Sequence, residues 1–173
     1  MVVTSSKNFS YSKTALLAGF SLFLASCATP PKPADSVDVD THVRQPAEQD
    51  SAGVQVFPLK NPAVGGLLED ADRAESDGQY DRAAMLLERA LRIQPRNPEV
   101  LQRMAEVQLS TGDYEQALNF AVRSYDVGPR VGEICSRNWR TIGVSRENLG
   151  DSKGSREALQ RARSCMVTKP QGM

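Results

Sequence analysis

Of the residue types most often used in nucleophilic catalysis and metal binding, histidine and cysteine are scarce in this sequence, with one histidine and three cysteines. His42 lies in a polar segment that contains prolines, where we expect it to be solvated rather than catalytic. Nucleophilic catalysis needs a base close to the nucleophile, and a pair between His42 and a serine or cysteine is improbable. There is no Gly-rich phosphate loop, no Cys-x-x-Cys and no cluster with metal-ligand spacing. We therefore expect no enzyme, cofactor, metal or small-molecule substrate.

Cys27 stands at the end of an apolar run, directly before a segment rich in proline and charge. Residues 1–13 carry two lysines and no acidic residue, and residues 14–26 are uncharged and mostly apolar. A basic start, an apolar stretch and small residues at a cut site are typical of a secretory signal. The stretch is also shorter than the roughly 20 residues that span a bilayer. Residues 1–26 are therefore predicted to be a signal peptide.

The four residues Leu24, Ala25, Ser26 and Cys27 resemble the lipobox of bacterial lipoproteins. This resemblance implies diacylation of the Cys27 sulfur, cleavage before Cys27, and acylation of the new amino terminus by a fatty acid such as palmitate. Ala28, in place of Asp, is similar to an outer-membrane sorting signal. Several acyl chains anchor a protein firmly, whereas one binds only marginally. We expect lipid anchoring at the periplasmic face of the outer membrane. The alternative is an ordinary signal peptide, cut nearby, that leaves a soluble periplasmic protein.

Composition narrows the class of partner. The 21 basic and 21 acidic residues cancel, which argues against nucleic acid because that partner calls for a basic face. Removal of 26 residues leaves 147, which is enough for one small domain and a tail.

Residues 27–60 are predicted to be a lipidated, Pro-rich, disordered linker. The part from 28 to 60 holds five prolines and few large apolar residues, so it cannot bury enough surface to offset its ordering entropy. Fully stretched, these residues reach about 110 Å at most. Within the linker, residues 54–57 alternate weakly and form either a short strand or an apolar patch before the folded part.

The rest of the chain contains an internal repeat. Residues 78–83 (GQYDRA) align with residues 112–117 (GDYEQA) at an offset of 34, and the same offset brings Pro95 onto Pro129. A period of 34 residues, with G-x-Y-x-x-A in the middle and proline at the end, resembles the tetratricopeptide repeat. A third unit follows at an offset of 38, where Trp139 begins a W-x-x-I-G motif similar to the start of such a repeat.

This resemblance implies an all-α fold, a short α-solenoid of three helical hairpins after the disordered linker. The repeats are expected at about 62–97, 98–131 and 132–167, within a domain of residues 61–167 that is followed by a tail of residues 168–173. The residue types support this arrangement. In the Asn-Pro pairs at 61–62 and 97–98, asparagine can cap a helix and proline can occupy its first turn. Gly78 and Gly112 can adopt the positive φ angle that a turn between two helices needs. The last helix has one charged face, as a terminal cap requires.

Two cysteines remain, Cys135 and Cys165, in a compartment that permits disulfides. Cys135 is expected at the start of the fifth repeat helix and Cys165 at the end of the sixth. These ends are neighbours in an antiparallel hairpin, so we favour a disulfide that stabilises the divergent third repeat. The alternative is two reduced cysteines in the core.

Tetratricopeptide arrays typically bind protein segments in a groove lined by the first helix of each repeat. By this resemblance, the partner-binding groove comprises Leu68, Asp72, Glu75, Glu99, Gln102, Glu106, Leu109, Arg137, Arg140, Val144 and Asn148. Residues 62–131 hold 8 basic and 12 acidic residues, and residues 132–173 hold 8 basic and 4 acidic ones. The array is therefore dipolar, and this field would orient a partner of opposite polarity.

The resemblance extends to function. The chain is similar to tetratricopeptide lipoproteins that activate bifunctional penicillin-binding proteins, which are peptidoglycan synthases. The expected function is thus a non-enzymatic interaction module, anchored in the outer membrane, that binds and regulates such a synthase. The alternative is a pilotin-like assembly factor for an outer-membrane or pilus machine.

Overall fold

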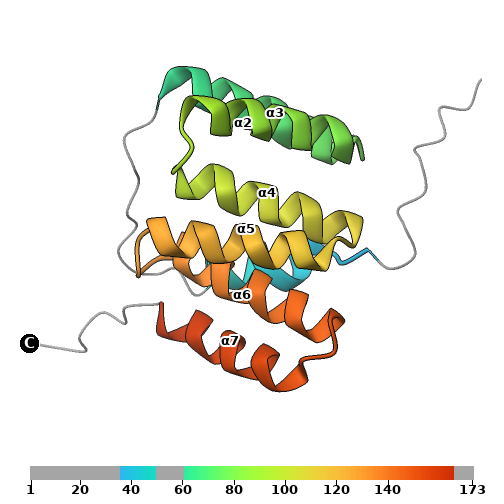
Figure 1. The fold of residues 1–173 in the computed structure, drawn as a ribbon, viewed down its shortest axis with the longest axis vertical. Helices are drawn as coiled ribbons and strands as arrows, with labels where there is room; N and C mark the ends of the chain where they lie inside the picture. The colour runs from blue at the N-terminus through green and yellow to red at the C-terminus, as the bar shows by residue number, and fades with distance from the viewer. Residues whose placement is uncertain (1–35, 50–60, 166–173) are drawn as a thin grey trace, which may run out of the picture.

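Three helical hairpins make up the folded domain (Figure 1). A computed structural model describes residues 36–49 and 61–165. The hairpins are α2 (Pro62–Ser76) with α3 (Tyr80–Ile93), α4 (Pro98–Thr111) with α5 (Tyr114–Val127), and α6 (Glu133–Asn148) with α7 (Ser152–Ser164). They stack in chain order, and the described residues contain no strand. The predicted all-α fold, a short solenoid of three hairpins, is confirmed.

The Asn-Pro pairs begin the first helices of repeats 1 and 2. The Asn61 side chain accepts a hydrogen bond from the Ala63 amide at 3.0 Å, and Asn97 accepts from Glu99 at 3.0 Å. Each asparagine thus satisfies an amide that has no partner within its own helix. The following proline occupies the first helical position, where its missing N–H is not needed.

Glycine closes the turn of each of these hairpins. Gly78 and Gly112 have φ angles of +72° and +82°, in the left-handed region that L side chains rarely adopt. Their 34-residue spacing therefore reflects a backbone requirement of the turn. Ala83 and Ala117 follow at the same spacing and are completely buried, which lets the two helices of a hairpin approach closely.

One continuous core runs through the stack. The first two hairpins share a cluster that includes Leu87, Val100 and Met104, and the third is built around Trp139 and Ile142. Phe120 on α5 packs against both clusters and so connects them. The stack ends at α7, where Ala158 and Ala162 are buried while its charged residues face solvent.

A disulfide joins Cys135, in the first turn of α6, to Cys165, directly after α7, with an S–S distance of 2.05 Å. Next to it, the Gly132 amide donates a hydrogen bond to the Cys165 carbonyl at 2.9 Å. Both contacts close the open end of the last hairpin. No proline ends this hairpin on the schedule of the first two, so the covalent link holds together the most divergent repeat.

One segment of the predicted linker is not extended, and there the prediction is wrong. Residues 39–49, here called the N-terminal helix, comprise a π-helical turn, η1 (Asp40–Arg44), and a short helix, α1 (Gln45–Gln49). Val39, Val43 and Ala47 recur every four residues and are almost completely buried. This spacing places them on one helix face. The prediction overlooked this pattern because it relied on the proline content of the whole linker. His42 is exposed, as expected.

Several predictions fall on residues outside the described ranges. These are the signal peptide and Cys27, the possible strand at 54–57, and the tail.

The disulfide closes a loop of 30 residues, so its loss should destabilise the domain. We expect Cys135→Ser with Cys165→Ser to lower the free energy of unfolding by about 3–4 kcal/mol, because the unfolded chain regains loop entropy. Urea unfolding, monitored by circular dichroism, measures this loss of stability. Dithiothreitol should destabilise the parent protein by a similar amount and leave the double variant unchanged. Equal stability of both proteins would show that the bridge contributes nothing.

Candidate protein-binding groove

The residues predicted to form a groove do lie on the first helices of the three repeats, α2, α4 and α6. Their accessibility differs greatly. Asp72 and Asn148 are exposed, and Leu68, Glu75, Glu99, Arg137, Arg140 and Val144 are half-buried. Gln102, Glu106 and Leu109 are buried. The middle of the expected groove is therefore covered by other parts of the chain.

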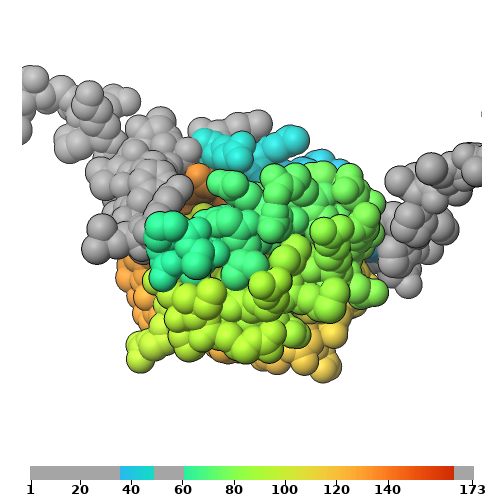
Figure 2. All heavy atoms as spheres, turned by 90° about the horizontal axis from the view of Figure 1, so that it is seen from above, coloured from blue at the N-terminus to red at the C-terminus, as the bar shows by residue number. Residues whose placement is uncertain are grey.

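The N-terminal helix provides this cover. It packs against α6, and Figure 2 shows it along one side of the hairpin stack, next to the first hairpin. Val39 and Val43 form a cluster with Leu109, and Val144 packs against the same cluster. Leu109 and Val144, both predicted groove residues, thus make apolar contacts with the N-terminal helix.

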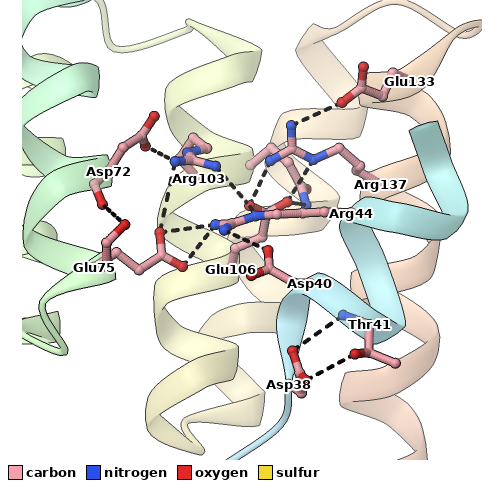
Figure 3. A network of polar contacts seen from close by, with 12 residues as sticks. Asp38, Asp40, Thr41, Arg44, Asp72, Glu75, Arg103, Glu106, Glu133 and Arg137 are labelled. Carbon is pink, nitrogen blue, oxygen red and sulfur yellow. Dashed lines mark hydrogen bonds and ion pairs between the residues drawn. The ribbon is translucent and has the colours of Figure 1, made fainter.

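Arg44 connects the N-terminal helix to two repeats at once (Figure 3). Its Nη2 donates to both carboxylate oxygens of Glu75 on α2, at 2.8 and 2.9 Å. Its Nε donates to Glu106 Oε2 on α4 at 2.9 Å, and its Nη1 donates to Asp40 at 3.0 Å. A planar guanidinium can satisfy several carboxylates in this way, whereas a lysine ammonium cannot reproduce the geometry.

Glu106 is the centre of the network, and its side chain is fully buried. Arg137 on α6 donates to its two oxygens from Nε at 2.8 Å and from Nη2 at 2.6 Å. Gln102 donates to Glu106 at 3.0 Å and to Thr141 of α6 at 2.9 Å. Arg103 lies 3.6 Å from Glu106 and pairs with Asp72 of α2. The Glu106 carboxylate therefore joins repeats 2 and 3 to the N-terminal helix, and Arg103 and Arg44 extend the network to α2 of repeat 1.

The balance between burial and nearby charge shifts the pKa values of two acids in this network, Glu106 and Glu75, in opposite directions. Burial by itself would raise the pKa of Glu106, but Arg137, Arg44 and Arg103 outweigh it and lower the pKa to about 2. Burial raises the pKa of Glu75, and Arg44 offsets only part of that effect. For the cationic Arg44, burial alone would lower the pKa, but the negative charges of Glu106 and Glu75 raise it above its ordinary value. The burial of Glu75 is thus less fully compensated by cations than the burial of Glu106.

A cleft remains open beside the N-terminal helix. It has a volume of about 470 Å³ and lies between that helix, α2 and α4. Its lining is polar and includes Asp40, Asp72, Glu75, Tyr80 and Arg103. This part of the concave face remains available to a partner while the N-terminal helix is in place.

Reasoning from sequence found some of these residues and missed others. The structure brings Asp72, Glu75, Glu106 and Arg137 into one network, whereas Asn148 donates to the Val144 carbonyl of its own helix. Arg44 was missed because it lies in the predicted linker. The signal that could have found it is the four-residue spacing of Val39, Val43 and Ala47 around it.

Within residues 36–49 and 61–165, no group of three or more His, Cys, Asp or Glu could hold a metal ion. In the same ranges, no helix combines the length and apolar character needed to cross a bilayer.

Stacked hairpins with a concave face built from their first helices define the α-solenoid class of helical-repeat proteins. The chain belongs to the tetratricopeptide-repeat family: a sequence model described as "Tetratricopeptide repeat" matches residues 74–123. A solved structure, the globular C-terminal domain of P. aeruginosa LpoP, is 37% identical, with a TM-score of 0.57 over 60% of this chain and 98% of that one.

A curated relative is more distant. The heat-shock protein cognate (HSC) co-chaperone sgt12 of Aspergillus fumigatus is 29% identical over 123 residues, which is 66% of this chain. The match spans 35% of that protein's length, so the chain corresponds to about a third of it. The repeat family and the similarity to LpoP indicate a protein-binding module.

Neutralising Glu106 should destabilise the domain at neutral pH. We expect Glu106→Gln to lower the free energy of unfolding by about 3 kcal/mol, because it leaves buried arginines without their anion. The folded pKa of about 2 lies below the ordinary 4.5, so this contribution is present above pH 4.5 and is lost as the pH falls toward 2. The difference between the two proteins should therefore shrink over that range in urea unfolding.

The matched control is Glu88→Gln, at an exposed position on α3, which should have little effect at any pH. Glu75 is present in both proteins, so its contribution largely cancels in the comparison. A loss of stability that is independent of pH would contradict the role of the Glu106 charge.

Proposed function

We propose that the protein is a lipid-anchored interaction module of the outer membrane that binds and regulates a peptidoglycan synthase in the periplasm. The observation that carries this proposal is the similarity to LpoP, which reaches 37% identity and covers 98% of that globular domain. The lipobox-like residues 24–27 and the resemblance to lipoprotein activators of penicillin-binding proteins support it from the sequence.

The proposed anchor is the lipidated Cys27. If the N-terminal helix stays in place, only residues 28–38 separate the lipid from the folded domain, and eleven residues reach about 40 Å at most. The domain then works close to the outer membrane. A synthase held in the inner membrane must in that case send a periplasmic segment toward it.

The proposed binding surface is the concave side, where the open cleft lies beside the N-terminal helix. Asp40 and Asp72 have exposed side chains there, and residues 62–131 carry a net negative charge. A basic segment of the partner complements this surface, and its charge would orient it on approach.

Replacing the proposed lipidation residue should release the protein from the membrane. We expect Cys27→Ser to move the protein out of the detergent-soluble outer-membrane fraction, because no acyl chain can then be attached. The control, Thr29→Ser, leaves residues 24–27 intact and should fractionate like the parent protein. A parent protein found in the soluble periplasmic fraction would instead favour an ordinary signal peptide.

The partner can be captured in cells with a photo-crosslinking amino acid at Ser76, an exposed residue that lines the cleft. We expect mass spectrometry to find a bifunctional peptidoglycan synthase attached at Ser76. The control position is Arg156, which is exposed on α7 at the far end of the stack and should give much less of this product. Equal capture at both positions would argue against the cleft, and capture of a secretin would favour an assembly factor.

A further inference from the structure

The N-terminal helix occupies the groove without being part of any repeat. The three hairpins are complete from Pro62 to Cys165, and two of the three core clusters consist of residues from within that range. The third cluster joins Val39 and Val43 to Leu109 and Ala117. The N-terminal helix adds a second set of contacts, an apolar face and one arginine, on the concave side. It is therefore placed like a bound ligand, although it belongs to the same chain.

We propose that the N-terminal helix is a resident ligand of the groove, and that an arginine-bearing amphipathic helix of the partner displaces it. This inference deepens the proposed function and rests on it, since it names the chemistry that the partner must present. The required features are small apolar residues spaced four apart and an arginine that follows the middle one, as Val39, Val43, Arg44 and Ala47 have it.

The carboxylates select the arginine. Arg44 is the residue that binds Glu75 at hydrogen-bond distance and Glu106 at the same time. Once Arg44 leaves, Glu106 still has Arg137, but the nearest cation to the largely buried Glu75 is Arg103 at 3.8 Å. An empty groove would therefore expose an undercompensated acid, and an incoming guanidinium restores the lost contacts.

The apolar contacts select small side chains. Val43 and Ala47 are completely enclosed, so a longer side chain at either place would require its neighbours to move. Leu109 is fully buried and Val144 half-buried where they pack with Val39 and Val43. Displacement without replacement would expose this apolar surface to water, so the groove favours exchange of one helix for another.

The intramolecular connection makes the resident helix a strong competitor, because a short tether gives it an effective concentration on the order of millimolar. The partner helix gains access only by binding more tightly or by being held close to the groove. Displacement also changes the reach of the lipid anchor. The chain between Cys27 and the hairpins lengthens from residues 28–38 to residues 28–60, or from about 40 to about 110 Å at most.

A competition experiment on the full mature chain tests this. The probe is a fluorescein-labelled peptide with the sequence of residues 36–49, and the variant Val43→Asp releases the resident helix while every groove residue stays intact. We expect fluorescence anisotropy to show at least about 10-fold tighter binding to Val43→Asp than to the parent protein, because the internal competitor is gone. His42→Asp is the matched control, since it introduces the same charge at an exposed neighbour and should bind like the parent.

Two further measurements complete the test. Hydrogen exchange at residues 39–47 should accelerate in Val43→Asp and not in His42→Asp, while α4 and α6 remain protected in both. A peptide in which lysine replaces the arginine should bind Val43→Asp about 10-fold more weakly, because a lysine ammonium lacks the planar array of donors that Arg44 presents to Glu75 and Glu106. A purely apolar contact would not distinguish the two peptides.

The proposal is overturned if exchange at residues 39–47 does not respond to Val43→Asp, or if the released groove fails to bind the peptide. It is also overturned if the lysine peptide binds as well as the arginine peptide. These failures can be told apart from a failure of the proposed function. If a synthase is crosslinked at Ser76 but the peptide does not bind, the partner uses the open cleft alone. Peptide binding with no synthase captured would mean a groove with this specificity and a different partner.

Discussion

The arrangement of the concave face depends on the burial of one carboxylate, that of Glu106. A charge without access to water must be compensated by nearby cations, and here they come from three elements: Arg137 on α6, Arg103 on α4 and Arg44 on the N-terminal helix. Such a network need not add more stability than an apolar core would. Its consequence is specificity, because α4, α6 and the N-terminal helix can meet in few other registers without leaving Glu106 uncompensated.

The repeat architecture could be predicted from sequence because its determinants are local. Asn61 and Asn97 cap helices through amides two residues away, and Gly78 and Gly112 satisfy a requirement of their own backbone. Each of these signals recurs within 34 to 36 residues and needs no knowledge of distant contacts. The divergent third repeat followed once the first two had set the pattern, even though its period is longer.

The N-terminal helix could not be predicted in the same way, because its stability comes from distant residues. Val43 packs near Leu109, and Arg44 bonds to Glu75 and Glu106, which are 31 and 62 positions away. A helix of this length is marginal alone and forms only where such contacts exist. The repeat pattern placed Arg137 on the first helix of the third repeat, but its pairing with Glu106 depends on how two repeats pack and cannot be predicted from the pattern.

Charge in this chain acts first within the molecule. Residues 62–131 carry four more acidic than basic residues, and Arg137, from the basic part that follows, neutralises one of those acids across the α4–α6 interface. Arg44, from before the repeats, compensates the same acidic region from the other side. The acidic surface of the first two repeats thus already binds one cation on a helix, Arg44 of the same chain. A partner that uses this surface must meet the same electrostatic requirement, so the internal contact is a guide to the external one.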